Sequence, residues 1–232
     1  MITKQWLILL FALAFALLLL GPPLLGQPFP GYPLMDWADV LDIATPLVLM
    51  PLYWVLFTDA GRVYRTLALT LAFVVLAALW TEGQGMHLSA NSIGNLFGGG
   101  TTQVHTLIHF YDEMLSHYLW HLGIVSLSIL LLAVSYSDPV SASATKWGII
   151  IPAAVMYGFT YFAAIVEGGT VPLGLPAAVL IVVWLLARKR NEIKTHNLVG
   201  FFFLAYAFAL LLFAVWFARW GGFPEFSAVG LI

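Results

Sequence analysis

The sequence predicts an all-α fold: a polytopic membrane helical bundle of seven transmembrane helices, with the N-terminus in the cytoplasm and the C-terminus outside (N-in/C-out). Three observations lead to this prediction. The 232-residue chain is 62% hydrophobic, only 9% of its residues are charged, and its apolar residues fall in long runs. Soluble domains carry about 25% charged residues, whereas about 20 apolar residues let a helix cross the hydrocarbon core. A transmembrane β-barrel would show short alternating segments instead.

Seven apolar segments define the expected helices, and residues 1–232 are expected to form a single integral-membrane domain. The first segment stops at Gly21-Pro22-Pro23 and is interpreted as a membrane helix, with a cleaved signal peptide as the alternative. Glycine, serine, asparagine and threonine gather at 82–104, which is therefore expected to be a polar loop. The expected helices are 5–25, 40–57, 63–81, 114–135, 147–166, 171–187 and 198–219.

The basic residues predict the orientation. With a cytoplasmic N-terminus, eight of the nine Lys and Arg residues fall on the inner side of the cell (cytoplasmic) membrane, as the positive-inside rule requires. Eight of the eleven acidic residues and five of the six histidines then fall on the outer side. Acidic residues contribute little to topology, so this second bias needs another cause. The inner basic residues are Lys4, Arg62, Arg65, Lys146, Arg188, Lys189, Arg190 and Lys194.

Four of the histidines lie in one stretch, HTLIHFYDEMLSHYLWH, at residues 105–121. Thr101 or Thr102 can cap a helix that begins after the preceding glycines, and this helix is expected to run from about 103 to 135. At ~50 Å it would be longer than the hydrocarbon layer is thick, so its first turns should stand in the outer interface. A ladder of residues at a spacing of four occupies these turns: His105, His109, Glu113, His117 and His121.

The ladder positions cannot all face one metal ion, because each step of four residues turns the direction by ~40°. We expect two sets, each with two imidazoles and one carboxylate, a combination that suits zinc or non-haem iron. The sets are His105, His109 and Asp112 on one side, and Glu113, His117 and His121 on the other.

A second polar group, EGQGMHLSAN, lies at 82–91. Its His87 and Asn91 are four residues apart and would share a face if this stretch coils. Glu82 and Glu167 follow the third and fifth apolar segments at equivalent ends. The predicted metal ligands are His87, His105, His109, Asp112, Glu113, His117 and His121, with Glu167 and Asn91 as further candidates.

Three carboxylates are predicted catalytic groups: Glu82, Asp112 and Glu113. A carboxylate can act as general base for a metal-bound water, whose pKa falls to about 7. Five histidines and several carboxylates exceed the needs of one zinc ion, so the predicted cofactor is iron or zinc, with a dinuclear centre as an option. Two other readings stay open: an interfacial polar network without metal, and haem ligation or a proton relay. The absence of cysteine excludes thiolate ligands.

Part of the ladder, HFYDEMLSHYLW, is similar to the His…Asp-Glu stretch of the alkaline-ceramidase-like membrane hydrolases. The resemblance implies a seven-helix zinc enzyme, but that family carries a second histidine pair on its last helix, and residues 198–219 contain no histidine. The pairs HTLIH and HYLWH resemble those of membrane hydroxylases and desaturases, whose adjacent His-His motifs are missing here. The sequence therefore assigns the chain to no family.

These observations predict an integral-membrane metal-dependent enzyme whose site lies near the extracytoplasmic surface. Its expected substrate is a lipid or another apolar molecule, and a non-haem iron oxidoreductase is slightly favoured over a zinc hydrolase. The alternative is a metal or cation transporter, or a metal-binding subunit of a membrane complex. The expected partners are membrane lipids and either further copies of the chain or a larger membrane complex; no feature indicates nucleic acid.

Overall fold

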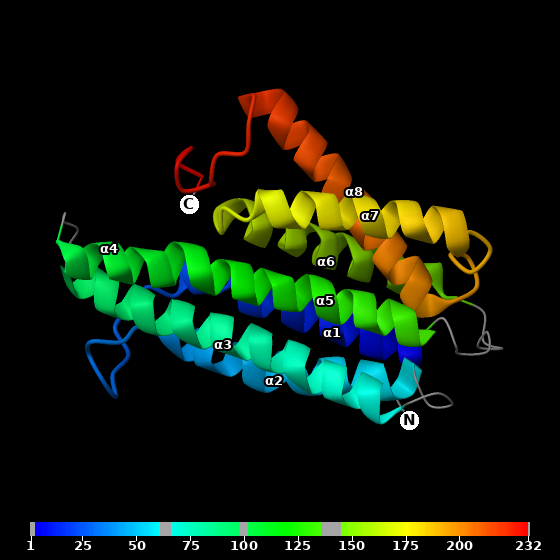
Figure 1. Cartoon of the computed structure of the whole chain (residues 1–232), viewed down its shortest axis with the longest axis horizontal. Helices are drawn as coiled ribbons and strands as arrows, with labels where there is room; N and C mark the ends of the chain where they lie inside the picture. The colour runs from blue at the N-terminus through cyan, green and yellow to red at the C-terminus, as the bar shows by residue number, and fades with distance from the viewer. Residues whose placement is uncertain (1–2, 61–65, 98–101, 136–144, 232) are drawn as a thin grey trace.

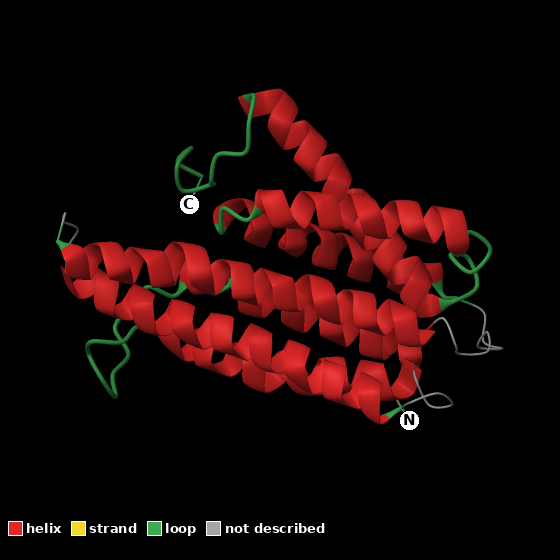
Figure 2. Ribbon diagram, viewed as in Figure 1, coloured by secondary structure: helices red, strands yellow, loops and turns green. Residues whose placement is uncertain are grey.

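The computed structural model describes residues 3–60, 66–97, 102–135 and 145–231, and its regular elements there are all helical apart from one isolated antiparallel bridge between Pro28 and Asp36. Figures 1 and 2 show the helices side by side, with α8 leaning away from the others at its far end. The elements are α1 (Lys4–Leu20), η1 (Pro22–Leu24), α2 (Trp37–Ala60), α3 (Leu67–Phe97), α4 (Gln103–His109), η2 (Phe110–Ser116), α5 (His117–Ser135), α6 (Trp147–Glu167), α7 (Val171–Arg188) and α8 (Asn197–Trp220).

Six helical stretches among the described residues are long and apolar enough to cross a membrane. One of them is the continuous 33-residue stretch Gln103–Ser135, which contains α4, η2 and α5. The remaining apolar helix, α1, has 17 residues and is shorter than a typical span. The all-α prediction is confirmed, and the fold is that of a multi-pass membrane protein. Seven crossings and the N-in/C-out orientation stay predictions; two of the basic residues behind the orientation, Arg62 and Arg65, lie outside the described residues.

The prediction of a polar loop at 82–104 is wrong for most of its length, because α3 continues without a break to Phe97. Its serines bond to backbone carbonyls of the same helix: Ser89 donates to the carbonyl of Gly85 (2.9 Å), and the Ser92 hydroxyl lies 2.8 Å from the carbonyl of Leu88 and also 2.7 Å from Oδ1 of Asp39 on α2. Packing against the next helical stretch therefore overrides the local turn signal. The glycines at 98–100 fall outside the described residues.

The long helix expected at about 103–135 is confirmed. Its cap is Thr102, whose side-chain oxygen accepts a hydrogen bond from the backbone N–H of His105 (3.2 Å). The middle of the ladder is not α-helical, however. Residues Phe110–Ser116 form a π-helix, whose i→i+5 hydrogen bonds widen the turn. The directions that an unbroken α-helix would give to the ladder side chains therefore do not hold across this segment, which separates His109 from His117.

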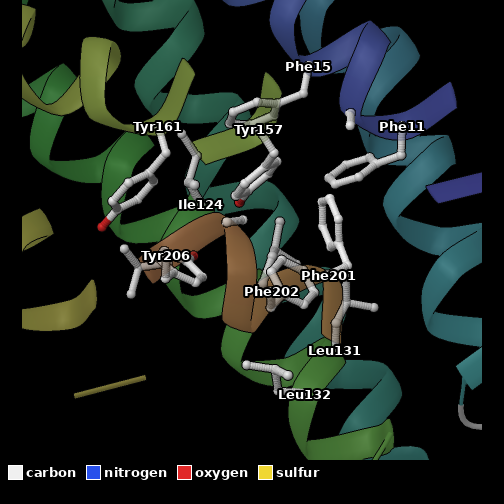
Figure 3. Close-up of a cluster of buried hydrophobic side chains, with 14 of the residues drawn as sticks. Phe11, Phe15, Ile124, Leu131, Leu132, Tyr157, Tyr161, Phe201, Phe202 and Tyr206 are labelled. Carbon is white, nitrogen blue, oxygen red and sulfur yellow. The ribbon is translucent and has the colours of Figure 1, made fainter. Parts of the chain in front are cut away.

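An aromatic cluster fills the centre of the bundle (Figure 3). The ring of Phe15 on α1 stacks on Tyr157 of α6 at a centroid distance of 4.4 Å, and Phe11 meets Phe201 of α8 edge to face at 6.4 Å. The Tyr157 hydroxyl lies 3.0 Å from the hydroxyl of Ser128. Buried charged side chains of the described residues lie near helix ends instead: Asp39, Asp42 and Asp112 toward one end, and Lys189 at the other.

Candidate histidine–carboxylate site

A cavity of about 270 Å³ opens at the end of the bundle where α1 terminates. Its walls combine the apolar side chains of Leu19, Pro22 and Pro23 with a concentration of titratable groups from five parts of the chain. The titratable lining residues are Asp42 of α2, His87 of α3, Glu113, His117 and His121 of η2 and α5, Glu167 of α6, and Glu225 after α8.

Close contact between α3 and the η2–α5 stretch brings the first two histidines together. A Cβ atom on Gly83 would lie 2.5 Å from the backbone nitrogen of Trp120, so only glycine allows this approach. One helical turn further along α3, the rings of His87 and His117 have centroids 4.8 Å apart. Nδ1 of His87 lies 2.7 Å from Oδ1 of the buried Asp112, an ion pair when the imidazole is protonated.

His117 and His121 form the buried floor of the cavity. They are 6% and 1% exposed, and their rings stack with centroids 5.8 Å apart. The rings also face the turn that follows α6, because a Cβ on Gly168 would lie 2.6 Å from Cε1 of His121 and 3.3 Å from Cγ of His117. Glu113 stands at the mouth, with Oε2 3.9 Å from Nδ1 of His117.

The ring of His121 has a fixed orientation. Its Nδ1 lies 2.6 Å from the hydroxyl oxygen of Thr170, a buried residue just before α7. With the proton on Nδ1, His121 donates to this hydroxyl and its Nε2 keeps a lone pair. That Nε2 atom is buried and has no hydrogen-bond partner in the described part of the chain. An unpaired buried imidazole nitrogen costs free energy unless a ligand engages it.

The π-helical segment explains which ladder residues turn inward. Its wide turn is accompanied by a hydrogen bond from the hydroxyl of Ser116 to the carbonyl of Asp112, and both residues are buried. Asp112 thus faces α3 although it lies only three residues after His109, which is exposed. Such segments occur frequently at functional sites.

The structure brings together part of the predicted site. His87, Glu113, His117, His121 and Glu167 line the cavity, and Asp112 contacts His87 from beside it. Four predicted residues do not line it: His105 is half-buried, His109 and Glu82 are exposed, and Asn91 accepts a hydrogen bond from Asn95 (3.4 Å). The two expected ligand sets are therefore not found as predicted. His105 and His109 of the first set do not line the cavity, while Asp112 and His87 lie with the second set of Glu113, His117 and His121.

Three polar residues at the site were not assigned a role from the sequence. Asp42 is buried, lines the cavity and accepts a hydrogen bond from Nε2 of Gln84 (3.1 Å). Thr170 lies just before α7, 49 residues after His121, and no local pattern indicates the contact between the two. The acidic residue at 225 follows the last apolar segment and gives no periodic signal.

No group of three or more His, Asp or Glu side chains in the described ranges already has the arrangement of a metal site. The fold and the cavity define a class: a multi-pass helical membrane protein with a buried histidine–carboxylate site at one end of its bundle. No protein-family model matches the chain, and comparison with curated proteins and with solved structures finds no significant match.

Proposed function

We propose that the chain is an integral-membrane metal-dependent enzyme, in which His87, His117 and His121 bind one divalent transition metal. One observation carries the proposal: three imidazoles from two helices meet in one cavity, and Nδ1 of His87 and of His121 lies 2.7 and 2.6 Å from a side-chain oxygen. Metal-binding histidines characteristically donate the second ring N–H to a carboxylate or another oxygen. Asp112 and Thr170 supply such oxygens, which leaves Nε2 of His87 and His121 for a metal.

The spacing of the rings supports a shared ion. Two imidazoles bound at about 2.0 Å to one tetrahedral metal have ring centroids roughly 5 Å apart. The centroid distances from His117 to His87 and to His121 are 4.8 and 5.8 Å. With His121 held by Thr170 and His87 beside Asp112, rotation of the His117 side chain, without displacement of the helices, would bring its nitrogen toward a centre shared with the other two.

One metal ion fits the site better than two. The surplus of ligands that suggested a dinuclear centre depended on His105 and His109, and neither lines the cavity. Three imidazoles with an open fourth position form the donor set of catalytic zinc. We therefore now favour a zinc hydrolase, and oxygen-activating iron, bound by two imidazoles and a carboxylate, is the alternative.

A metal at this place would activate a bound water for attack on an ester or amide. Glu113 stands beside His117 at the mouth and would accept the proton of that water. Asp112 would act as a positioning residue through His87, not as a ligand, because its carboxylate faces the imidazole at 2.7 Å.

The lining indicates the charge of the substrate. Acidic residues surround the cavity, and no Lys or Arg of the described residues lines it. An anionic headgroup would be repelled, so the substrate is a neutral or cationic amphiphile. The apolar wall of Leu19, Pro22 and Pro23 gives its hydrocarbon part a route from the bilayer. By the positive-inside rule this end of the bundle faces the extracytoplasmic side.

Cation transport is a second candidate, because an acidic mouth attracts cations. A transport path needs ionisable groups near the middle of the membrane. The aromatic cluster with Phe15 and Tyr157 occupies that region instead (Figure 3). Uptake of zinc into proteoliposomes at a rate above that of protein-free vesicles would favour transport over catalysis.

Metal analysis tests the proposal directly. The full chain, purified in detergent from cells supplied with both zinc and iron, is expected to contain one metal ion per chain by element-resolved mass spectrometry. A content near zero that does not rise on addition of Zn²⁺ or Fe²⁺ contradicts the proposal. Two ions per chain would contradict the mononuclear assignment.

Thr170→Val is expected to weaken metal binding by about 10–100-fold, the usual effect of removing an oxygen that orients a ligating histidine. The change removes the hydroxyl that holds Nδ1 of His121 and keeps the shape of the side chain. Chelator competition with Zn²⁺ measures the effect. Thr160→Val is the matched control, since that buried hydroxyl donates within its own helix, to the carbonyl of Met156 (2.8 Å), and does not line the cavity. Equal affinities of the two variants would show that Thr170 does not position a ligand.

A further inference from the structure

The chain beyond α8 turns back toward the end of α6, as Figure 1 shows. Gly221, with φ of 69°, ends the helix in the left-handed conformation and reverses the chain. Nε1 of Trp216 then donates to the carbonyl oxygen of Pro224 (3.0 Å). The ring of Phe226 packs between Trp216 and Phe162, at centroid distances of 4.5 and 5.8 Å. These contacts fix the path of the segment 221–231 next to the end of α6.

Glu167 anchors this segment. Its Oε2 accepts hydrogen bonds from the backbone N–H groups of Phe226 (2.7 Å) and Ser227 (3.4 Å). A carboxylate that accepts backbone hydrogen bonds makes strong, charge-assisted contacts. Glu167, expected from the sequence as a metal ligand, is thus engaged in holding residues 226 and 227, and it thereby fixes the neighbouring Glu225.

Glu225 reaches the same turn that supports the histidines. Its Oε1 lies 3.7 Å from the position that a Cβ on Gly169 would take, while the adjacent Gly168 faces the rings of His117 and His121. Glu225 lines the cavity together with Glu113. Two carboxylates in one cavity repel each other, and a bound cation would remove that repulsion.

We propose that Glu225 is the carboxylate that completes the metal site, delivered by the C-terminal segment and positioned by Glu167. The inference rests on the proposed function, because it assigns a fourth ligand to the same ion. Three imidazoles and one carboxylate give a zinc ion four protein donors in the resting state. Release of Glu225 would open a coordination position for water or substrate, so the C-terminal segment couples access to the site with its coordination.

The test compares Zn²⁺ affinity of the full chain in detergent, measured by competition with a chelator, for the wild type, Glu225→Gln and Glu82→Gln. Glu82 is exposed on α3 and does not line the cavity, so Glu82→Gln removes the same charge as Glu225→Gln but outside the site. We expect at least about 10-fold weaker binding for Glu225→Gln and wild-type binding for Glu82→Gln. Wild-type affinity of Glu225→Gln, with one zinc bound, overturns this inference and leaves the proposed function standing. Failure of the wild type to bind either Zn²⁺ or Fe²⁺ overturns both.

Hydrogen exchange separates the roles of the two glutamates. Glu167→Gln is expected to speed exchange of the Phe226 and Ser227 amides and also to weaken Zn²⁺ binding, because the segment that carries Glu225 is loosened. Glu225→Gln should weaken binding with amide exchange in the metal-free protein unchanged. Faster exchange in Glu167→Gln with wild-type zinc affinity would show that the segment only covers the cavity, and it would overturn the assignment.

Discussion

Replacing His121 with alanine is expected to reduce Zn²⁺ affinity by at least about 100-fold, since the change deletes a ligand and loss of a mere orienting group already costs 10–100-fold. The affected atom is the buried Nε2, which has no other partner in the described part of the chain. His105→Ala is the matched control. It removes another imidazole of the same ladder, but one that does not line the cavity. Its affinity is expected to equal that of the wild type.

His121 is 1% exposed, so its removal also leaves a void and lowers stability. Thermal unfolding in excess chelator measures this loss of stability alone, because no metal is then bound. The metal contribution appears as the additional difference between wild type and variant when Zn²⁺ is present. Equal losses of affinity in His105→Ala and His121→Ala would contradict the site and would favour a ladder that binds metal at the membrane surface.

The helices could be predicted because their signal is local. A run of apolar residues such as 147–166 or 198–219 indicates a helix without reference to other segments, and the structure places the ends of α6 and α8 within one residue of those bounds. Glycines carry an ambiguous signal. Gly83 and Gly85 suggested a loop, but Gly83 is present because α3 packs closely on α5. Sequence alone does not distinguish a glycine that ends a helix from one that lets two helices touch.

The site was predictable only in outline, because it depends on contacts between distant segments. The spacing of four identified the helix that carries His117 and His121, yet an α-helical wheel could not anticipate the π-helical turn that buries Asp112. Nothing near residue 170 shows that its hydroxyl would meet an imidazole 49 residues earlier. Pairing of this kind is decided by tertiary packing, on which hydropathy and periodicity carry no information.

The close contact between α3 and α5 yields the second prediction: Gly83→Ala and Gly85→Ala should change stability in opposite directions. Alanine is favoured over glycine within a helix by about 1 kcal/mol. At Gly85 no atom beyond the helix's own neighbouring backbone lies within 4 Å of the added Cβ among the described residues, so this preference should appear as a gain of up to that amount. At Gly83 the Cβ would lie 2.5 Å from the nitrogen of Trp120 and 2.7 Å from the carbonyl oxygen of Ser116, both backbone atoms.

Backbone atoms cannot rotate away as a side chain can, so α3 of the Gly83→Ala variant must shift as a unit. This shift should lower the stability by about 1–3 kcal/mol. His87 is one turn from Gly83 and would move away from His117, so Zn²⁺ affinity should fall together with stability. Denaturant titration in detergent measures the stability, and chelator competition measures the Zn²⁺ affinity. If Gly83→Ala unfolded at the same denaturant concentration as Gly85→Ala, α3 and α5 would not be in close contact at this point. The imidazoles of His87 and His117 would then lack the support that holds them in one cavity.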